Sequence, residues 1–154
     1  MKETTEIAKE MMIEFLEKMG IYATTVEVTL TEKDLYIIIT GDKKGILIGR
    51  HGRTLDSLQF LFNRMVGKRL GEGKRVYIDV DGYKAKRSDS LTKMAARLGE
   101  RVKRVGKSLT IGPFNPYDRR IIHLALREDP DLETESLGEG EMKRIRLIPK
   151  SKTY

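Results

Sequence analysis

The sequence predicts an α+β protein of two small domains, in each of which helices pack on a sheet. Segments with apolar residues at helical spacing alternate with short segments in which every second residue is apolar. Clusters of glycine and proline separate these segments, and 154 residues are enough for one ordinary domain or two very small ones. We expect residues 1–81 to form the first domain. Residues 82–154 would form the second, beginning with a long connecting helix over residues 83–105.

The first domain is expected to begin with an amphipathic helix that stops at Gly20. Its apolar residues recur at every fourth position and are Ile7, Met11, Phe15 and Met19. Alternating apolar residues over 26–30 predict one strand and the β-rich run 35–40 predicts a second, and the polar turn between them predicts a hairpin.

The rest of the first domain is interrupted by glycines. Residues 46–49 are expected to form a short helix, residues 53–66 a longer amphipathic helix, and residues 76–80 a further strand. Gly67, Gly71 and Gly73 are expected to interrupt the chain between the longer helix and that strand. The predicted order is therefore α-β-β-α-α-β.

The second domain is expected to contain a helix, a short strand, a second helix and a β-hairpin. An apolar stripe predicts that the first helix runs to Gly106, and it comprises Leu91, Met94, Ala95, Leu98, Val102 and Val105. A short strand over 109–111 ends at a Gly-Pro pair. Asn115 and Pro116 suit the start of a helix that would continue to about Glu128. Strands over 132–137 and 142–148 would follow.

The composition excludes several classes of site. The chain has no cysteine, which excludes a disulfide scaffold, a thiolate nucleophile and any cysteine-ligated metal site. Two histidines, His51 and His123, are too few for a histidine-rich zinc site. No apolar run approaches the roughly 20 residues that cross a bilayer, and the N-terminus lacks a secretion-signal pattern. We expect a cytoplasmic protein that does not insert into membranes.

The net charge of +7 is unevenly spread along the chain. Residues 82–107 hold nine Lys and Arg residues against only Asp89 and Glu100. Clustered cations attract phosphate. Because most charge runs are simply solvated helix faces, the charge alone predicts no site.

The most informative segment contains two glycines three residues apart, Gly49 and Gly52. Glycine permits a sharp turn, and the missing side chains let a phosphate chain approach the backbone. The helix that follows would offer its first N–H groups and the positive end of its dipole. Arg50, His51 and Arg53 would add charge or hydrogen-bond donors beside this turn.

Apolar residues on either side of the glycine pair, Ile48 and Leu55, are expected to form the wall of a groove for bases. A nucleoside triphosphate is a poor candidate ligand for this segment. It lacks the lysine and hydroxyl of a P-loop, and no G-x-G-x-x-G follows a strand.

The second motif places Arg119 and His123 four residues apart on one helix face, and Arg127 extends that face by a turn. A guanidinium can hold a phosphate with two hydrogen bonds, and an imidazole can add one donor. A lone histidine on a helix is nevertheless more often structural, so the spacing alone decides nothing.

Two pairs of polar residues on the last strands accompany this motif. Thr134 and Ser136 share one strand face, and Arg144 and Arg146 share a face of the final strand. The two arginines could contact nucleic acid or protect an exposed sheet edge by their charge, and both interpretations can hold together.

These two motifs and their surroundings resemble known modules. The hairpin, the Gly49–Gly52 turn, and the following helix and strand resemble a K-homology (KH) domain of type II, whose GxxG loop clamps about four nucleotides of single strand. The Asn115 helix with Arg119 and His123 resembles the R-three-H domain, which is associated with single-stranded nucleic acid. The two in this order resemble the bacterial Jag family, also called the SpoIIIJ-associated or KhpB family.

The resemblance implies a single-stranded RNA-binding protein, acting as an RNA chaperone or post-transcriptional regulator linked to cell elongation and division. It also implies a small single-KH partner protein. Many family members carry an additional N-terminal domain and linker, whereas this sequence starts directly at the first KH helix. The implied loop contacts are Ile48, Gly49, Arg50, His51, Gly52, Arg53 and Leu55. Those implied for the second domain are Arg119, His123, Arg127, Arg144 and Arg146.

Three other functions stay open from the residues. Single-stranded DNA is the main alternative ligand, because a phosphate clamp does not distinguish the sugars. A nuclease using His51 or His123 as general base has little support, since no obvious acidic cluster could hold two metal ions. A protein-interaction scaffold is the third. We expect no catalytic residue, no cofactor and no metal.

Overall fold

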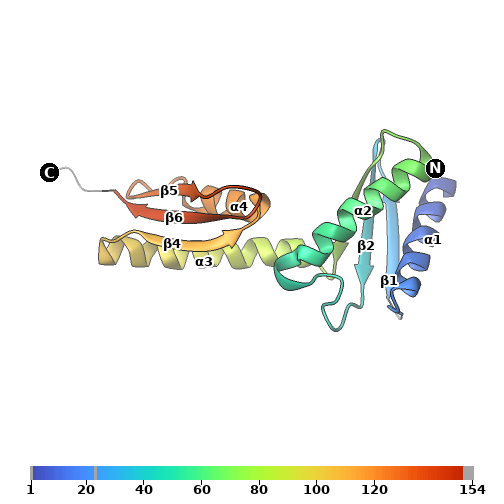
Figure 1. Ribbon diagram of the computed structural model, residues 1–154, viewed down its shortest axis with the longest axis horizontal. Helices are drawn as coiled ribbons and strands as arrows, with labels where there is room; N and C mark the ends of the chain where they lie inside the picture. The colour runs from blue at the N-terminus through green and yellow to red at the C-terminus, as the bar shows by residue number, and fades with distance from the viewer. Residues whose placement is uncertain (1, 23, 151–154) are drawn as a thin grey trace. The chain divides into compact units, whose positions relative to one another are not determined.

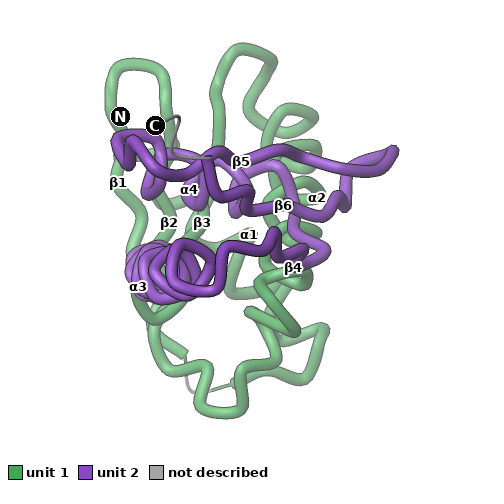
Figure 2. Tube along the Cα trace, turned by 90° about the vertical axis from the view of Figure 1, so that its left-hand side faces the viewer, with its two compact units in different colours: residues 1–84 green, residues 85–154 purple. Residues whose placement is uncertain are grey.

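The computed structural model describes residues 2–22 and 24–150 and confirms the α+β class. Within these ranges it has four α-helices and two three-stranded sheets (Figure 1). The chain divides into two compact units, Met1–Lys84 and Ala85–Tyr154 (Figure 2).

Unit 1 packs two helices on a sheet with the strand order β1-β2-β3. The sheet pairs β2 (Asp34–Thr40) antiparallel with β1 (Thr25–Leu30) and parallel with β3 (Arg75–Val80). The helices are α1 (Lys2–Lys18) and α2 (Arg53–Leu70). Alternation along β2 buries one side and leaves Tyr36 and Ile38 exposed on the other. The helices and the buried strand faces therefore share one core.

Helix α1 buries a different row of residues from the expected one. The fully buried positions are Ala8, Met12 and Leu16, whereas Met11 and Phe15 are only partly buried and Met19 is exposed. Apolar residues occupy two neighbouring rows of this helix. The sequence spacing alone did not show which of them faces the sheet.

Glycines change the helices of unit 1 in two ways that differ from expectation. Residues 46–49 form a hydrogen-bonded turn rather than a helix, because Gly45 and Gly49 adopt φ values of 65° and 68° that end right-handed helical geometry on both sides. Gly67 does not interrupt α2, which continues to Gly71 with a φ of 89°. A helical glycine costs only about 1 kcal/mol, which the packing of the neighbouring Val66 can offset.

Unit 2 packs two helices on one face of an antiparallel sheet with the order β4-β6-β5. The first helix is α3 (Tyr83–Val105), with the bounds expected from the sequence. The remaining elements of unit 2 are β4 (Leu109–Phe114), α4 (Pro116–Leu126), β5 (Leu132–Leu137) and β6 (Lys143–Pro149). Strand β4 runs through the predicted Gly-Pro break, with an irregular register between Ile111 and Phe114.

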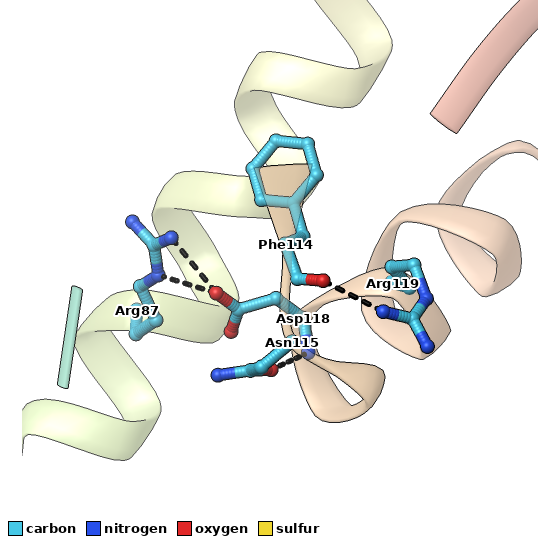
Figure 3. A network of polar contacts seen from close by, with 5 residues as sticks. All are labelled: Arg87, Phe114, Asn115, Asp118 and Arg119. Atoms are coloured by element: carbon cyan, nitrogen blue, oxygen red, sulfur yellow. Dashed lines mark hydrogen bonds and ion pairs between the residues drawn. The ribbon is translucent and has the colours of Figure 1, made fainter. Parts of the chain in front are cut away.

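Asn115 starts α4, as its position before Pro116 predicts. Its side-chain oxygen accepts a hydrogen bond from the Asp118 N–H at 2.8 Å. The buried carboxylate of Asp118 in turn accepts from Nη2 and Nε of Arg87 on α3, at 2.8 and 3.2 Å (Figure 3). This charge-assisted pair fastens the start of α4 to α3.

Replacing Asp118 by alanine is expected to destabilise unit 2 by about 2 kcal/mol, because it leaves the largely buried Arg87 without its acceptor. Hydrogen exchange of the β6 amides measures this loss within unit 2. Asp89→Ala is the matched control. Its pair with Lys93 has the same 2.8 Å length, but the Asp89 side chain is 64% exposed, so little change is expected. Equal exchange in the two variants would contradict the role of the buried pair.

Candidate nucleic-acid interface

The tip of the GxxG turn is exposed and carries the predicted cationic residues. Arg50 and His51 lie between the two glycines in a single 3₁₀ turn, η1 (Arg50–Gly52), and His51 adopts a left-handed conformation with φ 56°. Both side chains and that of Arg53 are exposed. The turn thus presents side-chain donors to solvent from a tightly curved backbone.

The loop closes back on the start of α2, which corrects one expectation. The Ile48 carbonyl accepts from the N–H groups of Thr54 and Leu55 at 3.1 and 3.2 Å. The Arg53 N–H donates to the Arg50 carbonyl. The first N–H groups of this helix therefore bind the loop rather than standing free for a phosphate. Within the described residues, the amides of Arg50 and His51 at the tip are left for a ligand.

Two aspartates that the sequence analysis missed hold this loop. The buried Asp42 carboxylate accepts from the backbone N–H groups of residues 46, 47 and 48, at 3.0, 2.9 and 3.4 Å. The Asp81 carboxylate, at the end of β3, accepts from the N–H groups of Gly41 and Asp42 at 2.9 and 3.0 Å. An Asp just after a strand, followed by a turn, is a local signal for such bonds.

Both glycines of the motif are also required by close packing. A β-carbon at Gly49 would lie 2.1 Å from Oγ1 of Thr54, and one at Gly52 would lie 2.7 Å from the ring of Tyr83. Tyr83, at the start of α3, was not among the predicted residues. The glycine pair therefore fixes how the loop packs in addition to leaving room for a ligand.

The two predicted groove residues do not lie where expected. Leu55 is 2% exposed and belongs to the core of unit 1, so it supports the loop from inside and cannot form a groove wall. Ile48 is half-buried against the same core. The large apolar side chain that the loop exposes is Ile46, at 51%.

In unit 2, His123 is bound by both hydroxyls that the sequence places on one strand face. Its Nδ1 lies 2.6 Å from Oγ1 of Thr134, and its Nε2 lies 2.9 Å from Oγ of Ser136. Burial, with a smaller effect from the charge of Arg119, lowers the pKa of the imidazole. His123 is therefore an internally bonded group in which burial favours the neutral form.

Arg119 has a partly structural role. Its Nη1 donates to the carbonyl of Phe114, at the end of β4, and to that of Glu141, between β5 and β6, at 2.7 and 2.6 Å. The bond to Phe114 is drawn in Figure 3. Both bonds use one nitrogen, so Nε and Nη2 can still donate to a ligand.

The structure separates the other predicted arginines of unit 2 from this cluster. Ile145 and Leu147 are fully buried toward the helices, so Arg144 and Arg146 lie on the opposite, open face of the sheet. Arg127 is exposed just after α4, with its Nε 3.4 Å from Oε1 of Glu128. The predicted residues of unit 2 thus fall into two surfaces, Arg119 with His123 and Arg144 with Arg146, while Arg127 stands apart from both.

Two kinds of feature are absent from the part of the chain that the structure describes. Among residues 2–22 and 24–150, no group of three or more His, Cys, Asp or Glu residues is placed to hold a metal ion. No helix in these ranges is long and apolar enough to span a membrane.

Comparison with known proteins finds both modules. Residues 9–80 match the family model "KhpA/KhpB, KH domain", and residues 89–149 match the model of the R-three-H domain. The chain is 38% identical over 145 residues to the RNA-binding protein KhpB of Clostridium symbiosum, covering 91% of this chain and 65% of the relative. It is 33% identical over 127 residues to KhpB of Bacillus subtilis, covering 81% and 61%.

The chain therefore spans slightly less than two thirds of the length of these relatives. The two family models together account for most of the chain, in the order in which the structure shows the units. With a KH domain followed by an R-three-H domain, the chain belongs to the KhpB (Jag) family.

Proposed function

We propose that this chain binds single-stranded RNA without catalysing a reaction, and that the tip of the GxxG loop is the seat for the phosphate backbone. The observation that carries the proposal is the exposed pair Arg50 and His51 on a loop anchored by buried hydrogen bonds. Their two amides and two side chains offer donors within one turn. Arg53 extends this positive surface into α2.

Unit 2 would add a second, weaker contact. Arg119 keeps free donors beside His123, and Arg127 lies further along the same stretch of chain. Arg144 and Arg146 would contact the ligand on the open face of the sheet. Two linked sites on one strand raise the affinity well above that of either site alone.

The relatives support the choice of RNA. They are named RNA-binding proteins, and their similarity extends over 91% and 81% of this chain. A role as an RNA chaperone or post-transcriptional regulator linked to cell elongation and division, in the cytoplasm, is part of the proposal. So is a small single-KH partner, which the shared KhpA/KhpB name of the KH model supports.

The test is the double variant Arg50→Asp, His51→Asp, measured against a single-stranded RNA of about 20 nucleotides at fixed salt. A charge-assisted hydrogen bond contributes about 1.5–3 kcal/mol and 1.4 kcal/mol is tenfold in affinity, so we expect a loss of at least about tenfold. The control Lys9→Asp, Lys33→Asp removes at least as much positive charge from exposed positions elsewhere in unit 1. Unchanged affinity of the first variant, with the fold intact, would remove the loop from the mechanism.

A competition between matched RNA and DNA oligonucleotides separates RNA from the alternative ligand, single-stranded DNA. Contacts limited to phosphates accept either sugar, whereas recognition of the 2′-hydroxyl favours RNA. Preference for DNA would assign the same loop to single-stranded DNA.

A further inference from the structure

Helix α3 carries a row of three arginines on its solvent side. Arg97, Arg101 and Arg104 follow at intervals of four and three residues, so they lie along one face, and all three are exposed. The core of unit 2 takes the other face of the helix, at Leu91, Ala95 and Val102. We call Arg97, Arg101 and Arg104 the α3 arginine row.

Across residues 2–22 and 24–150, no ion pair offsets the positive charge of this row. Glu100 lies on the same stretch of helix, but its carboxylate is 2.6 Å from Nζ of Lys103, which also pairs with Asp129 at 2.8 Å. The next acid on α3, Asp89, pairs with Lys93. None of the ion pairs among the described residues involves the arginine row.

The row also surrounds an open hollow on the surface. The hollow is lined by Arg97, Leu98, Glu100, Arg101 and Arg104. Leu98 supplies a partly buried apolar floor that continues into the core of unit 2. Guanidinium groups around a hollow can converge on one ligand, which is not possible on a strongly convex surface.

The chemistry of the row selects phosphate. Arginine presents a planar fork that binds a phosphate with two parallel hydrogen bonds, and it loses little hydration energy in doing so. Residues three to four apart on a helix are separated by about 4.5–6 Å along its axis, so the row can contact successive phosphates of one strand. Such contacts are independent of sequence.

A membrane surface fits the row less well than RNA does. A helix that binds lipid needs large apolar side chains beside its cations, so that they can enter the bilayer. All of α3 is described, and Val105, at 54%, is its one exposed large apolar side chain. The exposed side of α3 is instead polar and basic.

We propose that the α3 arginine row is a separate, sequence-independent binding site for the phosphate backbone of RNA. This inference rests on the proposed function, because it takes RNA as the ligand. The row would add affinity and salt dependence to binding at the GxxG loop, without adding selectivity for particular bases.

The experiment compares the triple variant Arg97→Gln, Arg101→Gln, Arg104→Gln with a control of equal charge change, Lys9→Gln, Lys18→Gln, Lys33→Gln. Binding of the full chain to a 20-nucleotide single-stranded RNA is measured over a range of salt concentrations. Each lost phosphate contact lowers the slope of log affinity against log salt by about 0.7 for a single strand, so we expect a decrease of about 2. The affinity at low salt is expected to fall about tenfold or more, equally for RNAs of different sequence, and the control is expected to change little.

A second variant, Arg97→Lys, Arg101→Lys, Arg104→Lys, keeps the charge and is expected to retain most of the slope. Wild-type affinity and slope in the glutamine variant would overturn the inference, while a loss of binding in Arg50→Asp, His51→Asp would still uphold the proposed function. Absence of RNA binding by the unmodified chain would overturn both. A defect confined to anionic lipid vesicles, with RNA binding unchanged, would also overturn the arginine row as an RNA site.

Discussion

Replacing Gly49 by alanine is expected to lower the affinity for single-stranded RNA by at least about tenfold. Gly49 has φ 68° and ψ −172°, a region that is essentially reserved for glycine and costs other residues about 1–3 kcal/mol. The new β-carbon would also meet Oγ1 of Thr54 at 2.1 Å and the Thr54 β-carbon at 2.7 Å. The loop must move to relieve this clash, and the tip that carries Arg50 and His51 would move with it.

Gly45→Ala provides the control within the same loop. Gly45 also has a positive φ, of 65°, but a β-carbon added there would have no neighbouring atom within 4 Å. The substitution therefore adds only backbone strain, about 1 kcal/mol, and is expected to leave RNA affinity nearly unchanged. Fluorescence anisotropy with a labelled RNA measures both variants. Equal affinities in the two would show that the position of the tip does not govern binding.

Replacing Asp42 by alanine is expected to destabilise the loop by about 3 kcal/mol and to weaken RNA binding. The substitution removes the acceptor of three backbone N–H groups, those of residues 46, 47 and 48. Buried donors without a partner cost about 1–3 kcal/mol each, and opening of the loop to water would recover part of that cost. Hydrogen exchange of these three amides, together with RNA affinity, measures the effect.

Asp42→Asn tests whether the carboxylate itself is needed. The asparagine amide keeps one acceptor oxygen. Its NH₂ group, however, would face the backbone N–H groups of residues 47 and 48, which now donate to Oδ2 of Asp42. The expected loop stability and RNA affinity of this variant lie between those of the wild type and those of the alanine variant. Retained protection of the three amides in Asp42→Ala would mean that Asp42 does not hold the loop.

Much of the fold follows from local patterns. Apolar alternation, β-rich runs and the turn residues between them located all the strands of the described chain to within a few residues, and glycines and the Asn115 cap located most helix ends. The exceptions have a common cause. The buried row of α1 and the continuation of α2 past Gly67 depend on which neighbour the helix packs against, and a local pattern does not contain that information.

The candidate site was predictable where it is local and not where it depends on distant contacts. The Gly49–Gly52 turn and its cations lie within five residues of sequence. By contrast, Asp81 binds the amides of residues 41 and 42, which are 40 and 39 positions away, through the parallel pairing of β2 with β3. The contact between Tyr83 and Gly52 likewise crosses the sheet-to-helix connection.

In unit 2, the difference between local and distant contacts also explains why Arg144 and Arg146 lie on another surface than Arg119. Spacing correctly placed Thr134 and Ser136 together, and the helix brought His123 to both. Spacing also placed Arg144 beside Arg146. Only the tertiary structure shows that α3 and α4 cover the other side of that strand.

The Asp42 and Asp81 carboxylates that hold the loop of the GxxG turn affect how quickly a ligand can attach. Because folding itself orders this turn, an arriving strand meets donors that are already in position and loses little conformational freedom of the protein on docking. Capture of the proposed RNA ligand is then expected to be governed by diffusion and by electrostatic attraction, which favours fast attachment.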